Sequence, residues 1–122
     1  MKIHLLSENA AISISIYVLT EVPKEILLSI YRGSHFLKSF PAVENNKLRL
    51  IGKASDLRDT VLKIRIRLAL SQVEISEISQ SKVEISFLDH KESIFSNWIY
   101  SLGNPTFFNP KLAHWDSEIL FE

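Results

Sequence analysis

Apolar and polar residues alternate along much of this chain, and this pattern limits the possible folds more than any other feature. Three runs, residues 12–18, 62–70 and 83–87, place an apolar side chain at every second position. Successive side chains of a β-strand point to opposite faces, so each run predicts a strand with one face on a core and the other in water. The expected core residues include Ile14, Ile16, Leu62, Ile64, Ile66, Leu68, Val83, Ile85 and Phe87.

Shorter stretches extend the strand pattern over more of the chain. The further candidate strands are residues 2–6, 36–40 and 47–52, and residues 71–76 recur in similar form as 81–86, as adjacent strands of a meander would. Segments with Ser, Asn, Asp or Gly separate the runs and predict turns or loops. These connecting segments are residues 7–10, 43–46, 54–59 and 80–81.

The segment 23–32 fits two different secondary structures. Proline begins it and glycine directly follows it, which is the end pattern of a helix. Ile26, Leu28 and Ile30 also alternate with their neighbours, as they would in a strand. The sequence leaves helix and strand open for this segment.

Residues 90–102 predict a short helix near the C-terminus. Asp89 followed three residues later by Glu92 would form a capping box at its start. The Gly-Asn-Pro sequence directly after it would end the helix. Its apolar residues recur at helical spacing, at Phe95, Trp98, Ile99 and Leu102.

Length and composition set the expected domain organisation. The chain has 122 residues, 46% of them hydrophobic, which is enough for one domain with its own core. We expect a single domain over residues 1–122, with residues 101–122 as an aromatic segment packed on the body or on a partner. By fold analogy alone, the strand pattern resembles immunoglobulin- or transthyretin-like sandwiches. The predicted fold is therefore a mainly β, antiparallel β-sandwich with one or two short helices.

Charge and cysteine content exclude several classes of protein. Fourteen Lys and Arg balance fourteen Asp and Glu, which argues against a disordered tail and against a general nucleic-acid binder. The absence of cysteine excludes disulfides and thiolate chemistry. The serine alternation near the N-terminus differs from the continuous apolar run of a signal peptide, and no stretch is long enough to span a membrane. We therefore expect a cytoplasmic protein without membrane contact.

The best candidates for chemistry are His90, His114 and Asp116. Imidazole and carboxylate suit zinc, manganese or iron, and an open coordination position would support a small metal-dependent or acid–base hydrolase. Asp89 and Glu118 are carboxylates close to them in sequence. This is an incomplete ligand set, so we expect no metal, no cofactor and no catalytic residues. The three glycines are also too far apart for a nucleophile elbow or a phosphate-binding loop.

Lys63, Arg65 and Arg67 form one cationic stripe on the polar side of their run. Such a stripe with stacking aromatic residues would support weak nucleic-acid binding, but no aromatic residue lies in this run. Opposite charges on neighbouring strands are ordinary sheet surface, so nucleic acid is the less favoured partner. The residues expected to extend or neutralise the stripe are Arg49, Glu74 and Glu84.

Residues 101–122 contain four large aromatic residues and two prolines. Proline disfavours regular structure, and aromatic side chains anchor protein interfaces. We expect Phe107 and Phe108 to pack partly inward and Trp115 to contact a partner. The favoured function is a non-catalytic protein-interaction module, such as a toxin-immunity protein, adaptor or assembly subunit, that binds another protein or itself. The expected partner-binding residues are Trp115, Phe107, Phe108 and Phe121, and a small-molecule ligand is left open.

Overall fold

The computed structural model of the chain describes residues 2–5, 8–19, 23–69, 82–91, 94–101, 105–109 and 111–122. These residues are mainly β: their strands form two sheets, and a single four-residue helix, α1 (Ala54–Leu57), is present among them. The mainly β prediction is confirmed. No helix in the described part of the chain is long and apolar enough to cross a membrane.

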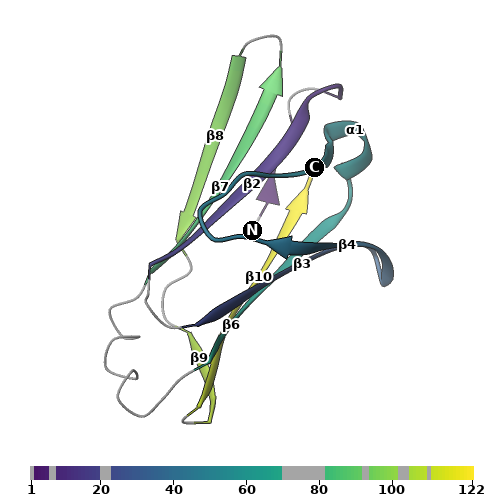
Figure 1. Cartoon of the computed structure of the whole chain (residues 1–122). Coiled ribbons are helices and arrows are strands. Elements are labelled where there is room, and N and C mark those ends of the chain that lie inside the picture. The colour runs from purple at the N-terminus through teal and green to yellow at the C-terminus, as the bar shows by residue number, and fades with distance from the viewer. Residues whose placement is uncertain are drawn as a thin grey trace.

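The larger sheet has six strands (Figure 1). Neighbouring strands within this sheet are antiparallel, with one exception. The first strand of the chain runs parallel to the last strand of the chain. In spatial order the main path is β1 (Lys2–Ile3), β10 (Leu112–Phe121), β6 (Val61–Ala69), β3 (Lys24–Arg32) and β4 (His35–Val43), and β9 (Thr106–Asn109) pairs with β10.

The smaller sheet has four strands, all antiparallel to their neighbours. Figure 1 shows β2, β7 and β8 side by side, apart from the strands of the six-stranded sheet. The spatial order is β5 (Arg49–Lys53), β2 (Ala11–Leu19), β7 (Lys82–Lys91) and β8 (Ile94–Ser101).

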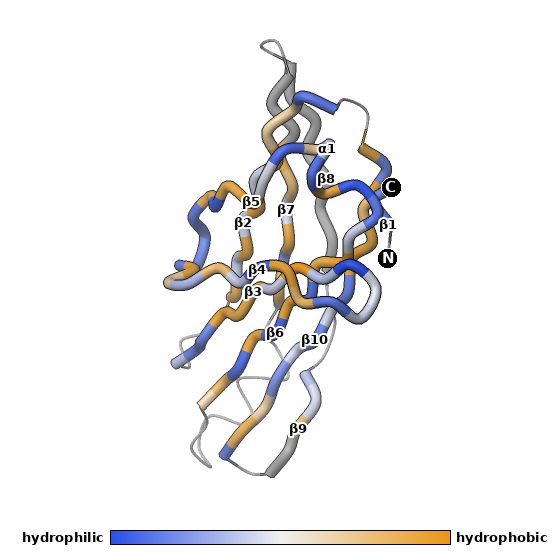
Figure 2. The backbone as a smooth tube through the Cα atoms, turned by 90° about the vertical axis from the view of Figure 1, so that its right-hand side faces the viewer, coloured by the Kyte–Doolittle hydropathy of each residue, from blue (hydrophilic) through white to orange (hydrophobic). Residues whose placement is uncertain are grey.

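The alternating runs place their apolar rows in the core, as the sequence predicts. All nine residues named above as core residues are at most 1% exposed. Along β6, every second residue is buried and its neighbours are exposed, which appears as alternating colours in Figure 2. Each buried Leu, Ile or Phe side chain contributes roughly 1.5–3 kcal/mol to folding, so these rows are the main source of stability.

Buried residues of both sheets belong to one hydrophobic cluster. Phe87 of β7 and Phe121 of β10 meet within it in an edge-to-face contact, with ring centroids 5.8 Å apart. Each sheet therefore has a core-facing side and an opposite side, which we call its outer face.

The ambiguous segment 23–32 is a strand. Lys24–Arg32 forms β3, which lies between β6 and β4, and its alternating isoleucine and leucine residues are buried. Gly33 follows with φ +61° and begins a two-residue loop into β4. Glycine at the first loop position is typical of a type II′ hairpin turn, so here it connects two strands and does not end a helix.

The predicted helix over 90–102 is wrong. β7 continues to Lys91, and β8 pairs with it from Ile94 opposite Lys91 to Ser101 opposite Glu84. The aromatic and β-branched residues of this segment suit a strand as well as a helix, and the backbone of β7 supplies a hydrogen-bonding edge for them. Apolar spacing over two helical turns could not distinguish these alternatives.

Regular structure in residues 101–122 also differs from the expectation drawn from proline. Leu112–Phe121 forms β10, which pairs with β6 over nine positions. Pro105 precedes β9, where it removes no ladder hydrogen bond, and Pro110 lies outside the described residues. The sequence does contain a strand signal here, because the buried residues Ala113, Trp115, Ile119 and Phe121 all lie on one side of β10.

Two connecting segments and the internal repeat complete the comparison with the sequence. The connecting segment 54–59 contains α1 followed by Asp59 at φ +64°, so part of it is helical. The first copy of the internal repeat, residues 71–76, and the predicted turn at 80–81 lie outside the described residues.

Candidate functional site

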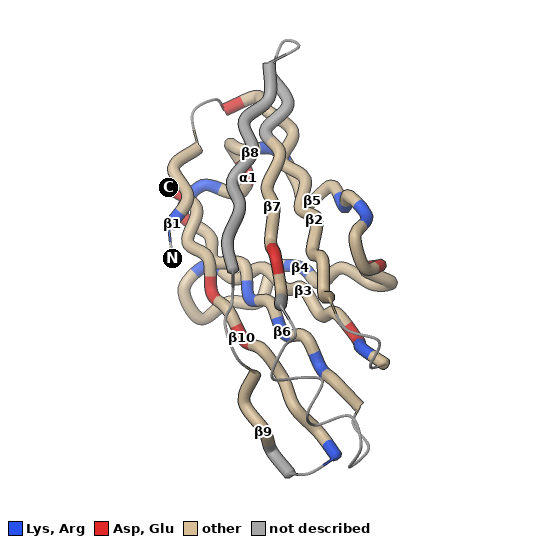
Figure 3. The backbone as a smooth tube through the Cα atoms, turned by 90° about the vertical axis from the view of Figure 1, so that its left-hand side faces the viewer, with Lys and Arg blue, Asp and Glu red and all other residues tan. Residues whose placement is uncertain are grey.

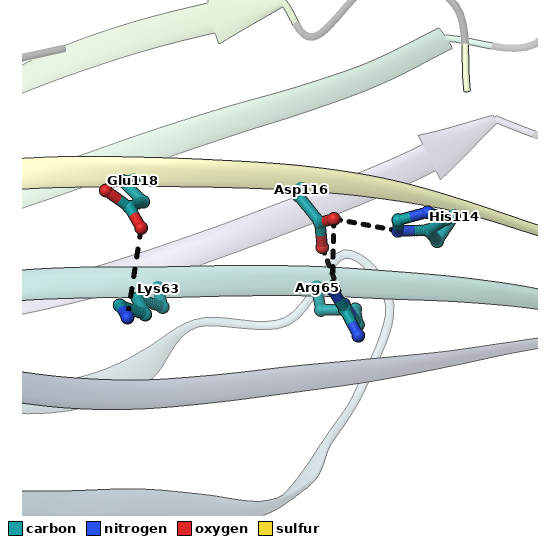
Figure 4. Close-up of polar contacts among 5 residues, drawn as sticks. All are labelled: Lys63, Arg65, His114, Asp116 and Glu118. Atoms are coloured by element: carbon teal, nitrogen blue, oxygen red, sulfur yellow. Dashed lines mark hydrogen bonds and ion pairs between the residues drawn. The ribbon is translucent and has the colours of Figure 1, made fainter. Parts of the chain in front are cut away.

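The outer face of the six-stranded sheet carries the cationic stripe of β6. Lys63, Arg65 and Arg67 alternate with the buried residues of this strand and are exposed. Asp116 lies directly opposite Arg65 in the pairing of β10 with β6. Arg65 donates to both of its carboxylate oxygens, Nε to Oδ1 at 2.7 Å and Nη2 to Oδ2 at 3.1 Å (Figure 4).

The other two cations of the stripe also meet carboxylates. Lys63 Nζ lies 3.9 Å from Glu118 Oε1 on β10, and Arg67 Nη1 lies 3.9 Å from Glu25 Oε2 on β3. Lys63 Nζ also lies over the ring of Tyr31, 4.4 Å from its centroid. Neighbouring strands therefore neutralise the whole stripe.

The residues expected to extend or neutralise this stripe lie elsewhere. Glu84 is in β7 of the four-stranded sheet, opposite Tyr17, and Arg49 begins β5 of that same sheet. Both expectations are wrong, because they assumed strand neighbours that the topology does not provide. Glu74 lies outside the described residues.

Electrostatics at Asp116 follow from two neighbouring side chains, those of Arg65 and His114. Hydrogen bonds from Arg65 lower the pKa of the Asp116 carboxyl below its usual value, against a smaller opposing effect of burial. His114 lowers it further, with Nδ1 2.8 Å from Asp116 Oδ2. The hydrogen bonds between Arg65 and Asp116 also raise the pKa of Arg65. Asp116 is therefore held as a carboxylate and is already engaged by two partners.

The candidate metal ligands are only partly brought together. His114 and Asp116 are adjacent in space, whereas the Glu118 carboxylate faces Lys63 (Figure 4). His90 lies in β7 of the four-stranded sheet, opposite Ala11, whereas His114 and Asp116 lie in the six-stranded sheet. The side chains of His90 and Asp89 are outside the described part. Among the described residues, no group of three potential metal ligands converges. This arrangement orients an imidazole but does not present an open coordination site.

An open hollow of about 440 Å³ lies over this ion-paired face. Its lining includes the three stripe cations and the carboxylates of Asp116 and Glu118. An anionic ligand entering it would have to displace carboxylates from Lys63, Arg65 or Arg67, which lowers the affinity that their charges could provide.

The outer face of the four-stranded sheet has a different chemistry. On β2, the residues that alternate with the buried isoleucines are uncharged, and Figure 3 shows no Lys, Arg, Asp or Glu along this strand. Leu50 of β5 and Leu88 of β7 lie on either side of Ser13, and Ser86 lies opposite Ser15. We call this surface the leucine–serine face, which comprises Ser13, Ser15, Tyr17, Leu19, Leu50, Glu84, Ser86 and Leu88.

Two leucines on this face have at least half of their surface exposed. Leu50 is 59% exposed and Leu19 is 50% exposed, while Leu48, just before β5, is exposed to a similar degree. Among the described side chains, Glu84 is the charged residue within the face, and Lys53 of β5 lies at its end, paired with Ala11. Sequence reasoning missed this surface because the register that places Leu50 and Leu88 beside Ser13 depends on strand pairing.

The aromatic residues expected to bind a partner occupy different environments. Trp115 is 3% exposed and Phe121 is fully buried, because both lie on the core-facing side of β10. Phe107 of β9 is 46% exposed, and the side chain of Phe108 lies outside the described part. This order is the reverse of the expected one, in which Trp115 was the more accessible residue. No protein-family model, curated protein or solved structure matches this chain.

Proposed function

We propose that this protein is a non-catalytic protein-interaction module that binds its partner through the leucine–serine face. Roles of this kind include an immunity protein, an adaptor or an assembly subunit. The observation that supports the proposal is the pairing of exposed leucines with an almost uncharged sheet surface, since the centres of protein interfaces are depleted of charge. Exposed apolar surface of this kind marks interaction sites.

The gain from covering this face comes from the leucine side chains. Leu19 and Leu50 each expose about half of their surface, and burial of a whole leucine side chain is worth roughly 1.5–3 kcal/mol. Serine hydroxyl groups lose less on leaving water than carboxylates or ammonium groups do. A partner that covers this face therefore gains apolar burial at a small cost in desolvation.

The two alternative functions receive less support from the geometry. The hydrolase hypothesis relies on His90, His114 and Asp116, and the last of these is held by Arg65 and His114. The nucleic-acid hypothesis relies on the stripe of Lys63, Arg65 and Arg67, whose cations have carboxylate neighbours. Both activities would need these ion pairs to open first.

We also propose that the two sheets form one β-sandwich domain, of the immunoglobulin-like or transthyretin-like kind. The single hydrophobic cluster, with members from β1 to β10, supports this arrangement. The contact of Phe87 with Phe121 supports it further, because it joins β7 of one sheet to β10 of the other.

Substitution of an exposed leucine, with a matched control, tests the proposed function. Leu50→Lys places a charge on the leucine–serine face, and Leu112→Lys places one on β10 at a residue of similar exposure, 48%. Tagged wild type and both variants are used to capture proteins from a lysate of the source cells, followed by quantitative mass spectrometry.

The proposal expects one set of captured proteins, which can be the untagged chain itself, to be retained by the wild type and by Leu112→Lys and lost by Leu50→Lys. Equal capture by all three proteins would show that the leucine–serine face is not the binding surface. Circular dichroism of each variant checks that the fold is intact.

A further inference from the structure

We infer that the partner covering the leucine–serine face is a second copy of this chain, packed face to face about a two-fold axis. The inference rests on the proposed function and specifies its partner. In such a contact the same patch meets itself, so the patch must suit itself in charge, in shape and in area. The leucine–serine face meets each of these conditions.

Charge is the first condition. The described charged residues of the face lie toward the two ends of β2: Lys53 pairs with Ala11 at one end, and Glu84 pairs with Tyr17 toward the other, away from the rung of Leu50, Ser13 and Leu88. Two copies can thus meet with their uncharged regions in contact. The ion-paired face would instead bring several charged groups from each copy, and removing water from them carries a large free-energy cost.

Shape is the second condition. An isologous contact needs raised and low regions on the same patch, because each copy supplies both. Leu50 and Leu88 flank the small residue Ser13 in one rung, and Ser15 and Ser86 form the next low rung beside it. Leucines of one copy can therefore lie over the serines of the other.

Area is the third condition. β2 has nine residues, which corresponds to a length of about 30 Å, and the three strands that contribute to the face, β5, β2 and β7, are together about 14 Å wide. The footprint is then about 400 Å² per copy, or about 800 Å² in total, within the range of weak and transient protein contacts. This area predicts a reversible dimer whose population depends on concentration.

The β4 edge of the six-stranded sheet exposes Phe36 and Leu37 but is a poorer surface for self-association. β4 is the edge strand, and its pairing with β3 shifts register at two places. It also carries Lys38 and Pro41, which hinder addition of a further strand. Edge-to-edge pairing of two copies would bring Lys38 of each near the other strand, so the face is favoured over the edge.

Sedimentation velocity across about a hundredfold range of protein concentration tests the inference directly on the full chain. The variants Ser15→Arg and Leu50→Lys alter the face, and Ser29→Arg and Leu112→Lys are their controls. Ser29 is a half-buried serine like Ser15, but it lies on β3 in the other sheet.

The wild type and both controls should change from monomer to dimer as concentration rises. Ser15→Arg and Leu50→Lys should raise the dissociation constant of the dimer at least about tenfold, while their thermal unfolding stays cooperative. Added salt should leave the wild-type dimer intact, because apolar contacts are not screened.

Three outcomes overturn the inference, and they are separable from failure of the proposed function. The first is a wild type that stays monomeric throughout, and the second is a dimer that both face variants leave unchanged. In the third, a monomeric wild type captures a different protein in a manner that depends on Leu50, which leaves the interaction module correct and the second copy wrong. If capture is also independent of Leu50, both proposals fail.

Discussion

The outer faces of the two sheets arise from the same alternation, yet they carry opposite chemistry. On β6 the polar row is Lys63, Arg65 and Arg67, and β10 supplies carboxylates directly across from it. On β2 the corresponding row is serine and tyrosine, with leucines on the neighbouring strands. Alternation determines which residues are buried, whereas the identity of the polar row determines the chemistry of the outer face.

Solvation free energy explains the difference between these faces. Charged groups at the surface keep their hydration, and exposed ion pairs add only about 0–1 kcal/mol to stability. A face of hydroxyl groups and leucine side chains loses little hydration when covered and gains from apolar burial. The ion-paired face is therefore suited to solvent, whereas covering the leucine–serine face would cost less hydration.

The comparison of the two outer faces requires that both sheets pack on one core. Substitution of Trp115 is the strongest test of that requirement. Trp115 is 3% exposed on β10, directly beneath the ion-paired face. Trp115→Ala should lower the free energy of unfolding by about 3–5 kcal/mol, the usual cost of truncating a buried aromatic residue. Chemical denaturation measures this loss.

Phe107→Ala is the matched control for Trp115→Ala, because Phe107 is 46% exposed on the adjacent strand β9. It should change the unfolding free energy by less than about 1 kcal/mol. If Trp115→Ala left stability unchanged, β10 would not belong to the shared core, and the description of an outer face on the six-stranded sheet would fail.

Asp116 tests the contribution of the ion pairs to stability. Asp116→Ala removes the carboxylate that binds Arg65 and His114. Since this side chain is 45% exposed, solvent screens the interaction, and the loss in unfolding free energy should be about 1 kcal/mol or less. A loss well above this value, measured by denaturation, would mean that the face is held together by its charges and is more than a solvated surface.

Local alternation predicted the rows on β2, β6 and β7, because a strand's two faces are encoded by neighbouring residues. It did not predict that Asp116 would face Arg65, since these residues are 51 positions apart in the sequence. That contact depends on β10 pairing beside β6, which is a property of topology. The same limitation hid the position of Leu50 beside Ser13.

The errors at the C-terminal end have a related cause. Apolar residues in 90–102 satisfied helical spacing, but β7 offers its backbone as a partner, and pairing with it outweighs a short helical pattern. The large apolar surface of Trp115 suits an interface, and on sequence alone this favours contact with a partner. The buried Ala113, Ile119 and Phe121 on the same side of β10 show that this surface is used inside the protein.

The pH dependence of the unfolding free energy tests the ion-paired face through one group, the Asp116 carboxyl. Hydrogen bonding by Arg65 lowers the folded-state pKa of Asp116, so this group stabilises the fold above its unfolded pKa of about 3.9. The stabilisation is lost as the pH falls through the lowered pKa. The part lost should be about 0.5 kcal/mol or less, because the pair is exposed.

Asp116→Asn isolates this effect, because asparagine does not titrate. Unfolding free energies of wild type and Asp116→Asn should converge as the pH drops below about 4, and separate again above it. Parallel curves over the whole range would show that Asp116 has the same pKa in the folded and unfolded chains, which contradicts the role assigned to Arg65.

The smallest expected change in stability comes from giving the leucine–serine face the chemistry of the other face. Ser15 and Ser86 lie directly opposite each other on β2 and β7, so Ser15→Glu with Ser86→Lys introduces a cross-strand ion pair there. Because surface substitutions and exposed pairs contribute little, the unfolding free energy should stay within about 0.5 kcal/mol of the wild type. Self-association should nevertheless disappear in sedimentation velocity, because the new charges must keep their water.

A control that replaces both serines with threonine keeps the face uncharged and should still dimerise. Persistence of the dimer in the charged variant, with wild-type affinity, would show that charge is not what separates the two faces.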